Sequence, residues 1–417
     1  MTACWTSLAE VCEINPRLPR DHGLADDTPV SFVPMAAVDE VSGVVRDKQQ
    51  RAIREVKKGY TSFRDGDVLF AKITPCMENG KSAIARDLLN GVGFGSTEFH
   101  VLRPKAGVLP EWIYYFVRRE PFRSEAKRNF TGTVGQQRVP ATFLANCRIP
   151  VPPLDEQRRI VDLLFRAEGI VRLRREAQKK AAEIIPALFL DMFGDPATNP
   201  MEWKEAPLGD VVEEFRYGTS QKSTERGFPV LRIPNVIGGR IDTADMKLVE
   251  VSQVEAQRLR LRDGDLLFVR TNGNPNYVGR SAVFEGDVMQ KAGFSRDDCL
   301  YASYLIRARL RKGVLQPKYL QVFLATFEGR KRLREQARTS AGQYNINTDG
   351  LSCIRVLVPP QPLQAAFEDR CVQALALQEQ QRIATEKATG TFASLLSQVF
   401  SSDSVKVCQS AEAMVTA

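Results

Sequence analysis

The sequence contains one large unit twice, and this repeat limits the folds that the chain can adopt. FRDGDVLF (63–70) recurs as LRDGDLLF (261–268), and GKSAIARD (80–87) recurs as GRSAVFEG (279–286). PEWIYYFV from Pro110 matches PKYLQVFL from Pro317, and the stretch 133–153 matches 340–360. The matches keep their order at an offset of about 200 residues, far above the period of a solenoid. The chain is therefore a duplication of one domain-sized unit.

Each unit combines strands and helices. Short apolar runs such as VLFAKI and SYLIRARL, bounded by Gly, Pro, Asn and Asp, predict the strands of a small irregular sheet. PEWIYYFVRRE and PKYLQVFLATF space their apolar residues at helical intervals after a proline that suits a helix start. We therefore predict an α+β fold for each of two tandem homologous domains.

Each unit ends in a Pro-Pro pair and continues into a long segment with apolar residues at a 4,3 spacing. In the segment from Asp155 to Ile185 the predicted seam consists of Ile160, Leu164, Ala167, Val171, Arg174, Ala177 and Ala181. In the second half it consists of Phe367, Cys371, Ala374, Gln378, Gln381, Thr385, Ala388, Phe392, Leu395 and Val399. Each amphipathic helix needs a partner for its seam, so we predict that the two pair as an antiparallel coiled coil.

This pairing predicts a division of the chain into five parts. They are a first α+β domain (1–153), a central long helix and linker (154–200), a second α+β domain (201–360), a C-terminal long helix (361–402) and a flexible tail (403–417). An antiparallel pair would place the domains at opposite ends of a rod. A helix of roughly 30 residues spans ~45 Å. This length equals about 13 base-pair steps along a DNA double helix.

Composition favours a polyanionic partner and disfavours several other classes. Lys and Arg number 58 against 50 Asp and Glu, giving a net charge of +8, although such a charge also occurs in proteins without a polyanionic partner. Eight cysteines without a C-x-x-C pair and only two histidines, His22 and His100, leave little material for a zinc site. No apolar run approaches the thickness of a bilayer and no secretion signal is recognisable, so we expect a cytoplasmic protein.

The candidate DNA-reading residues lie in polar loops between the shared strands. Arginine presents a bidentate fork to guanine, and asparagine or glutamine pairs with adenine in a similar way. A first loop in each unit offers Lys72, Thr74, Asn79 and Lys81, or Arg270, Asn272, Asn274, Asn276, Tyr277 and Arg280. A second loop offers Gln136, Gln137 and Arg138, or Gln343, Tyr344, Asn345 and Asn347. Tyr217, Ser220 and Lys222 form a further polar patch.

Each of these motifs has a simpler interpretation. The asparagines also suit turns, and Asp-Gly-Asp before an apolar strand indicates a turn more than a metal site. Asn274-Pro275-Asn276-Tyr277 is one residue away from the NPPY signature of adenine methyltransferases, but the sequence lacks a Gly-rich loop for a methyl donor. It also lacks a phosphate-binding Gly-rich loop with Lys-Ser/Thr and a credible Ser-His-Asp set, so we expect no catalytic residues and no metal.

The pattern resembles the specificity subunits of type I restriction-modification systems. The most specific marks are PLGDVVEEFRYGTS, GFPVLRIPNV, DGDLLFVR followed by a short polar loop and GRSAVF, and GQYNIN before VPP and a long helix. The resemblance implies a non-catalytic subunit whose two α+β domains are target-recognition domains that read a bipartite, asymmetric site in double-stranded DNA. It also implies that two modification subunits methylate adenine N6, that restriction subunits can join, and that S-adenosylmethionine and ATP bind to those partners.

Two other functions stay open at this stage. A stand-alone DNA-modifying enzyme would require clustered carboxylates or a donor-binding loop. A protein-protein scaffold would carry its basic charge incidentally. The bases recognised, the length of the spacer and the choice between restriction and methylation do not follow from the sequence.

Overall fold

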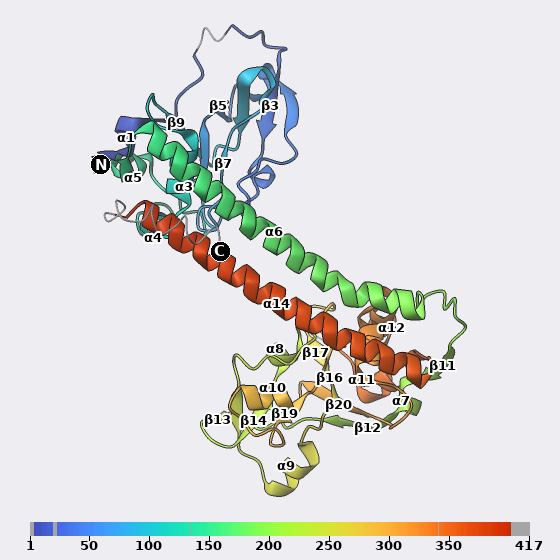
Figure 1. Cartoon of the computed structure of the whole chain (residues 1–417). Coiled ribbons are helices and arrows are strands. Elements are labelled where there is room, and N and C mark those ends of the chain that lie inside the picture. The colour runs from blue at the N-terminus through green and yellow to red at the C-terminus, as the bar shows by residue number, and fades with distance from the viewer. Residues whose placement is uncertain (1–3, 20–22, 134, 341, 402–417) are drawn as a thin grey trace. The chain divides into compact units, whose positions relative to one another are not determined.

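The computed structural model describes residues 4–19, 23–133, 135–340 and 342–401 (Figure 1). The predicted tail at 403–417, His22 and Cys408 therefore lie outside the described residues. By packing, the chain divides into unit 1 (residues 1–177 and 382–417) and unit 2 (residues 178–381). The division passes through both long helices, so each unit contains one domain and a part of each helix.

Unit 1 contains two four-stranded sheets. The first is antiparallel and follows the order β2 (Cys12–Ile14), β9 (Phe99–Pro104), β6 (Val68–Ala71) and β7 (Ser82–Ile84). The second follows the order β4 (Gln49–Ala52), β3 (Pro29–Val33), β8 (Val92–Gly95) and β5 (Thr61–Arg64), with β3 and β8 parallel. A separate pair joins β1 (Cys4–Ser7) to β10 (Arg148–Val151). The helices of this unit's domain are α1 (Leu8–Val11), α2 (Ile53–Val56), α3 (Pro110–Arg118), α4 (Glu120–Arg128) and α5 (Ala141–Asn146).

Unit 2 repeats the antiparallel sheet of unit 1. This sheet runs β12 (Val212–Tyr217), β20 (Leu305–Leu310), β16 (Leu266–Val269) and β18 (Ser281–Val283). Its second sheet runs β13 (Ser223–Thr224), β15 (Lys247–Val249), β14 (Phe228–Leu231) and β19 (Leu300–Tyr301), with β14 and β19 parallel. The edge strand β13 pairs with β15, whereas in unit 1 the edge strand β5 pairs with β8. As in unit 1, a separate pair joins the entering strand β11 (Lys204–Pro207) to the last strand β23 (Arg355–Val358).

The helices of the second domain follow the same plan. They are α7 (Leu208–Val211), α8 (Ile233–Val236), α9 (Gln253–Leu259), α10 (Gly286–Lys291), α11 (Pro317–Ala325), α12 (Phe327–Gln336) and α13 (Thr348–Ser352). Both predicted proline-initiated helices form, with Pro110 and Pro317 in the first turn. The predicted α+β duplication is confirmed.

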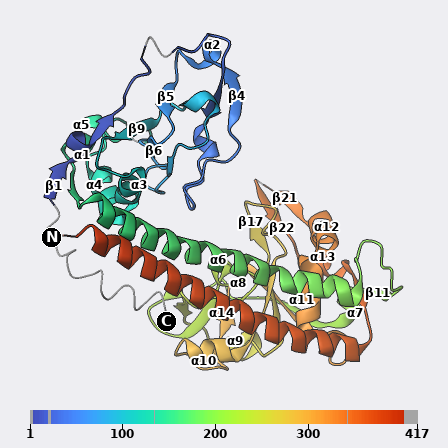
Figure 2. The ribbon, with the colours of Figure 1, turned by 45° about the horizontal axis from the view of Figure 1, so that its top comes forward.

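The two long helices, α6 (Leu154–Phe193) and α14 (Gln361–Val399), lie side by side (Figures 1 and 2). In unit 1, Ile160 near the start of α6 shares a core with Val399 at the end of α14. In unit 2, Phe189 near the end of α6 shares a core with Phe367 near the start of α14. The predicted antiparallel pairing is therefore confirmed.

The polar residues of the predicted seam contribute hydrogen bonds. The side-chain amide of Gln378 donates to the carbonyl of Ala181 at 2.9 Å in unit 2, and the hydroxyl of Thr385 donates to the carbonyl of Arg174 at 3.3 Å in unit 1. The predicted seam positions are buried or half-buried, except that Arg174 is exposed. Arg174 therefore belongs to the solvated face of α6.

Helix α6 continues eight residues beyond the predicted end at Ile185, through Pro186. Proline removes one backbone N–H from a helix and usually ends it. Here Ile185, Phe189 and Phe193 recur at four-residue spacing and are all buried in the core of unit 2. Burial of two phenylalanines offsets the lost hydrogen bond, since each buried large apolar side chain contributes about 1.5–3 kcal/mol.

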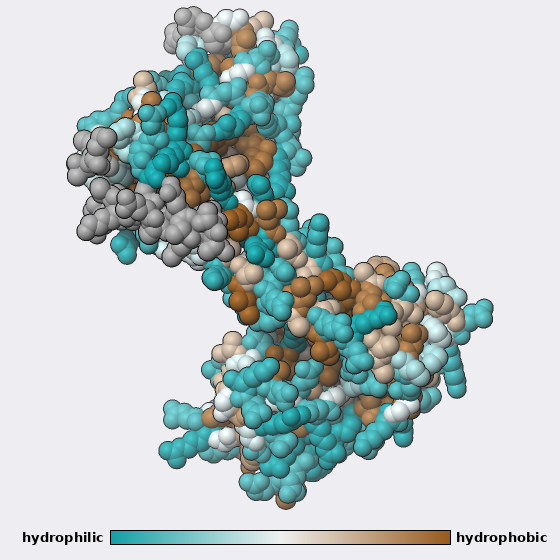
Figure 3. All heavy atoms as spheres, in the orientation of Figure 1, coloured by the Kyte–Doolittle hydropathy of each residue, from teal (hydrophilic) through white to brown (hydrophobic). Residues whose placement is uncertain are grey.

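Apolar side chains also remain at the surface of the long helices. Phe165 and Leu173 of α6 are 63% and 62% exposed, and Val372 of α14 is 62% exposed. Figure 3 shows brown, hydrophobic side chains along the helices among teal, hydrophilic ones. These three apolar side chains are therefore accessible at the surface of the long helices.

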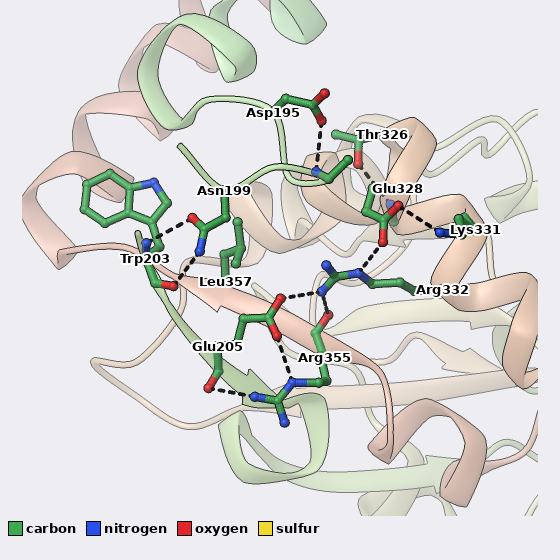
Figure 4. A network of polar contacts seen from close by, with 12 residues as sticks. Asp195, Asn199, Trp203, Glu205, Thr326, Glu328, Lys331, Arg332, Arg355 and Leu357 are labelled. Carbon is green, nitrogen blue, oxygen red and sulfur yellow. Dashed lines mark hydrogen bonds and ion pairs between the residues drawn. The ribbon is translucent and has the colours of Figure 1, made fainter. Parts of the chain in front are cut away.

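A polar network fastens the segment that follows α6 to the body of unit 2 (Figure 4). Glu205 of β11 accepts hydrogen bonds from Arg355 of β23 at 2.8 Å and from Arg332 of α12 at 3.0 Å. These contacts, led by the hydrogen bond from Arg355, lower the pKa of Glu205. Asn199 forms two further hydrogen bonds with the backbone of Trp203, so this connection is ordered.

A buried glutamine fixes the start of each long helix to its domain. Gln157 donates to the carbonyls of Gly107 and Pro152 and accepts from the backbone N–H of Leu109 at 3.0 Å. Gln364 makes the equivalent contacts in unit 2 with Val314, Pro359 and Gln316. The same joint therefore occurs in both units.

Within the described residues, no helix is both long enough and apolar enough to cross a membrane.

Candidate nucleic-acid interface

In unit 2 the two predicted loops meet in one small sheet. Strand β17 (Thr271–Asn272) of the first loop pairs with β22 (Gln343–Asn345) of the second, which pairs in turn with β21 (Arg338–Ser340). The hydroxyl of Thr271 donates to the side-chain oxygen of Gln343 at 2.9 Å. We call these two segments, 270–280 and 342–347, the second loop pair.

Tyr217 lies beside the second loop pair. The guanidinium of Arg270 stands 4.8 Å from the centre of the Tyr217 ring, and the Tyr217 hydroxyl accepts from the backbone N–H of Thr348 at 3.3 Å. Ser220 and Lys222 are exposed on the chain that follows, and no hydrogen bond or ion pair among the described residues joins them to the loops. The structure thus brings together Tyr217 and the two loops.

In unit 1 the equivalent loops, 72–81 and 135–138, form the first loop pair. The backbone N–H of Thr74 donates to the carbonyl of Gln137 at 3.1 Å, and Ile73 forms an antiparallel bridge with Arg138. Gln136 is exposed and Gln137 is half-buried. Asn79 and Lys81 instead hydrogen-bond to Glu40 and to the carbonyl of Met35, both on the segment after β3.

The same backbone hydrogen bonds hold both loop pairs. The N–H of Lys72 donates to the carbonyl of Glu98 and its carbonyl accepts from Val139, both at 2.9 Å. The N–H of Arg270 donates to the carbonyl of Tyr304 and its carbonyl accepts from Ile346, again at 2.9 Å. One backbone frame therefore presents two different sets of side chains.

Two residues beside these loops were not predicted from the sequence. Glu98 accepts two hydrogen bonds from Arg138, at 2.8 and 2.9 Å, which lower the pKa of Glu98 and raise that of Arg138. Tyr304 is 59% exposed next to Arg270. Glu98 directly precedes β9, and Tyr304 directly precedes β20. In the sequence, both residues therefore look like the beginning of an apolar strand and not like part of a polar loop.

The asparagines of the second loop pair serve as turn formers. The side-chain oxygen of Asn272 accepts from the N–H of Asn274, that of Asn274 accepts from Asn276, and that of Asn347 accepts from Gly350. Their side-chain amide groups can still donate. Base contact by these asparagines stays a prediction.

The remaining members of the second loop pair stiffen it. Asn276 is exposed and its carbonyl accepts from Arg280, whose guanidinium lies 4.7 Å from the ring centre of Tyr277. Tyr344 and Asn345 are half-buried within β22. The loop therefore presents its polar groups on an ordered backbone.

The Asp-Gly-Asp motifs are structural turns. Gly66 and Gly264 adopt φ angles of 86° and 85°, which favour glycine. The buried Asp67 accepts two hydrogen bonds from Arg103 at 2.8 Å, and Asp265 accepts two from Arg309 at 2.7 and 2.8 Å. Within the described residues, no cluster of three or more His, Cys, Asp or Glu could hold a metal ion.

Parts of the sequence match known DNA specificity proteins. Residues 5–183 match the family model of the type I restriction modification DNA specificity domain. The specificity subunit of the type I restriction enzyme EcoAI from Escherichia coli is 40% identical over 158 residues, which are 38% of this chain and 26% of that protein. The specificity subunit of EcoKI from E. coli strain K12 is 29% identical over 66% of this chain and 61% of its own length. The matches thus span less than two thirds of either relative.

The fold is shared over almost the whole chain with a solved structure. A chain from a study titled "Structural basis underlying complex assembly and conformational transition of the type I R-M system" aligns with a TM-score of 0.62 and 22% identity, covering 96% of this chain and 98% of that one. The chain is thus similar in sequence to type I restriction-modification specificity subunits over parts of its length, and it shares its fold with this solved chain.

Proposed function

We propose that this chain is the DNA-reading subunit of a type I restriction-modification complex, with each unit reading one half of a bipartite, asymmetric site in double-stranded DNA. The observation that carries the proposal is the repeated backbone frame at Lys72 and Arg270 with different side chains on each copy. Equivalent frames would dock on DNA in the same way, whereas different side chains would read different bases.

The long helices would recruit the catalytic partners. Phe165, Leu173 and Val372 lie exposed on helices whose other faces are already packed. We assign these exposed faces to two modification subunits that methylate adenine, with restriction subunits able to join. S-adenosylmethionine and ATP would bind to those partners, and this chain would itself catalyse no step.

The test is to map methylated adenines in the genome of a cell that expresses this chain with its modification subunit. We expect one consensus of two short specified tracts separated by a gap of fixed length and indifferent sequence. A single continuous tract, or methylation without sequence preference, would overturn the proposal. Methyl transfer by the purified chain alone would support a stand-alone enzyme instead.

A further inference from the structure

Unit 2 contains a cavity of about 680 Å³ beside α12, which we call the α12 cavity. Among the described residues, five basic side chains contribute to its lining, namely Arg240, Arg280, Lys318, Arg330 and Arg334, and no carboxylate does. Apolar side chains such as Ile237 and Phe327 complete the wall. We propose that the α12 cavity binds a phosphate group, carried either by a small phosphorylated ligand or by the DNA backbone.

Hydrogen bonds to neutral oxygen atoms hold two of these basic groups. Arg330 donates to the carbonyls of Asn276 and Val278, and Lys318 donates to the side-chain oxygen of Gln321 at 2.9 Å. Among the described residues, none of the five forms an ion pair, and Nη1 of Arg330 is buried without a hydrogen-bond partner. An anion would supply the missing acceptor.

Crowding of like charges supports the same conclusion. Burial, together with the positive charges of Arg280 and Arg334, lowers the pKa of Arg330 to about 10. Burial and the positive charge of Arg240 also lower the pKa of Lys318, although Cys371, Glu285 and Glu368 act in the opposite direction. A bound dianion would relieve the repulsion among the three arginines.

Unit 1 provides an internal comparison. By the repeat, Arg123 and Lys127 of α4 correspond to Arg330 and Arg334 of α12. In unit 1 the carboxylate of Glu78 pairs with Lys127 at 2.5 Å, and its carbonyl accepts from Arg123 at 2.6 Å. The position equivalent to Glu78 in unit 2 is Tyr277, so the second copy keeps the basic groups and lacks the carboxylate.

The test is calorimetric titration of the full chain with inorganic pyrophosphate at low ionic strength. Arg334 is exposed, so Arg334→Gln should fold normally and weaken binding about tenfold through the loss of one charge-assisted contact. Lys331→Gln removes an exposed charge from the same helix, outside the cavity lining, and should bind as the unchanged chain does. Arg240→Gln is a second cavity variant, should Arg334→Gln prove unfolded by circular dichroism.

Two further arms identify the source of the phosphate. If saturating duplex DNA displaces pyrophosphate, the cavity binds a phosphate of the DNA backbone, and this assignment rests on the proposed function. If ATP displaces pyrophosphate and DNA does not, the ligand is a small phosphorylated molecule. Absence of saturable pyrophosphate binding, or equal loss in Lys331→Gln and Arg334→Gln, would overturn the inference. The titration requires no DNA, so its failure is distinct from a failure of the methylation map.

Discussion

Asp67 and Asp265 occupy equivalent positions, and each holds an arginine of the neighbouring strand through two hydrogen bonds. Asp67 is almost completely buried, whereas its partner Arg103 retains a quarter of its side-chain exposure. Removal of one member of such a pair leaves an uncompensated charge inside the protein. These residues therefore secure the strands behind the loop pairs.

Asp67→Ala should lower the free energy of unfolding of unit 1 by about 3–5 kcal/mol, because Arg103 loses its buried partner. Asp27→Ala is the matched control, since Asp27 and Arg54 form an exposed pair worth about 1 kcal/mol or less. Denaturant unfolding measures both. Equal losses in the two variants would contradict the structural role of Asp67.

His100 makes the stability of unit 1 depend on pH. Its Nε2 lies 2.8 Å from the carbonyl of Val139, and its Nδ1 lies 3.0 Å from the side-chain amide of Asn15. This arrangement fits a neutral ring that donates through Nε2 and accepts at Nδ1. Burial is the main cause that lowers the pKa of His100, so the unfolded chain binds a proton more readily than the folded chain does.

The stability that His100 contributes should therefore be present above pH ~6.5 and decline as the pH falls below that value, by at most about 1.4 kcal/mol per pH unit. Chemical unfolding of the unchanged chain and of His100→Gln between pH 7 and 5 tests this. His100→Gln should show the shallower dependence. A steeper loss of stability in His100→Gln would refute the assignment.

At the scale of elements, α6 shows how tertiary packing overrides a local signal. Pro186 predicts a helix end, yet Phe189 and Phe193 continue into the core of unit 2. Phe189→Ala should lower the free energy of unfolding by about 3–5 kcal/mol. Leu190→Ala is the control on the adjacent, half-exposed position and should change it by less than about 1 kcal/mol. Similar effects at both positions in denaturant unfolding would contradict the packing of this segment.

The glutamine joint is a second property of the elements. Gln364→Ala would leave the N–H of Gln316 and the carbonyl of Pro359 without their partner, at a cost of roughly 1–3 kcal/mol for each buried group. Gln373 lies at an exposed position of the same helix, so Gln373→Ala should leave the free energy of unfolding almost unchanged. Thermal unfolding compares the two, and a neutral Gln364→Ala would show that the joint adds no stability.

The helices and strands could be predicted from the sequence better than the contacts between them. The repeat and the 4,3 spacing predicted the duplicated α+β fold and the antiparallel helices, because burial patterns repeat along the chain. Pairing of β17 with β22 depends on contacts far apart in sequence, which no local pattern encodes. The partnership of Arg138 with Glu98 and the exposure of Tyr304 escaped prediction for the same reason.

At the scale of the whole molecule, the chain joins two copies of one backbone frame in a single polypeptide. A symmetric dimer would read the same bases twice. A fused duplication can diverge, as the contrast between Gln136-Gln137 and Gln343-Tyr344 illustrates. In the proposed function, this divergence would let the two units read different halves of an asymmetric target.

The most direct test of the account is a map of methylated adenines for two matched variants, each expressed with the modification subunit. One variant changes Gln136 and Gln137 of unit 1 to Ala, and the other changes Gln343 and Asn345 of unit 2 to Ala. We predict that each variant relaxes base preference in one half of the consensus, by ~1–3 kcal/mol for each lost base contact, and leaves the other half intact. Altered preference in both halves from a change in one unit, or methylation with an unchanged consensus in both variants, would contradict the claim that each loop pair reads its own half.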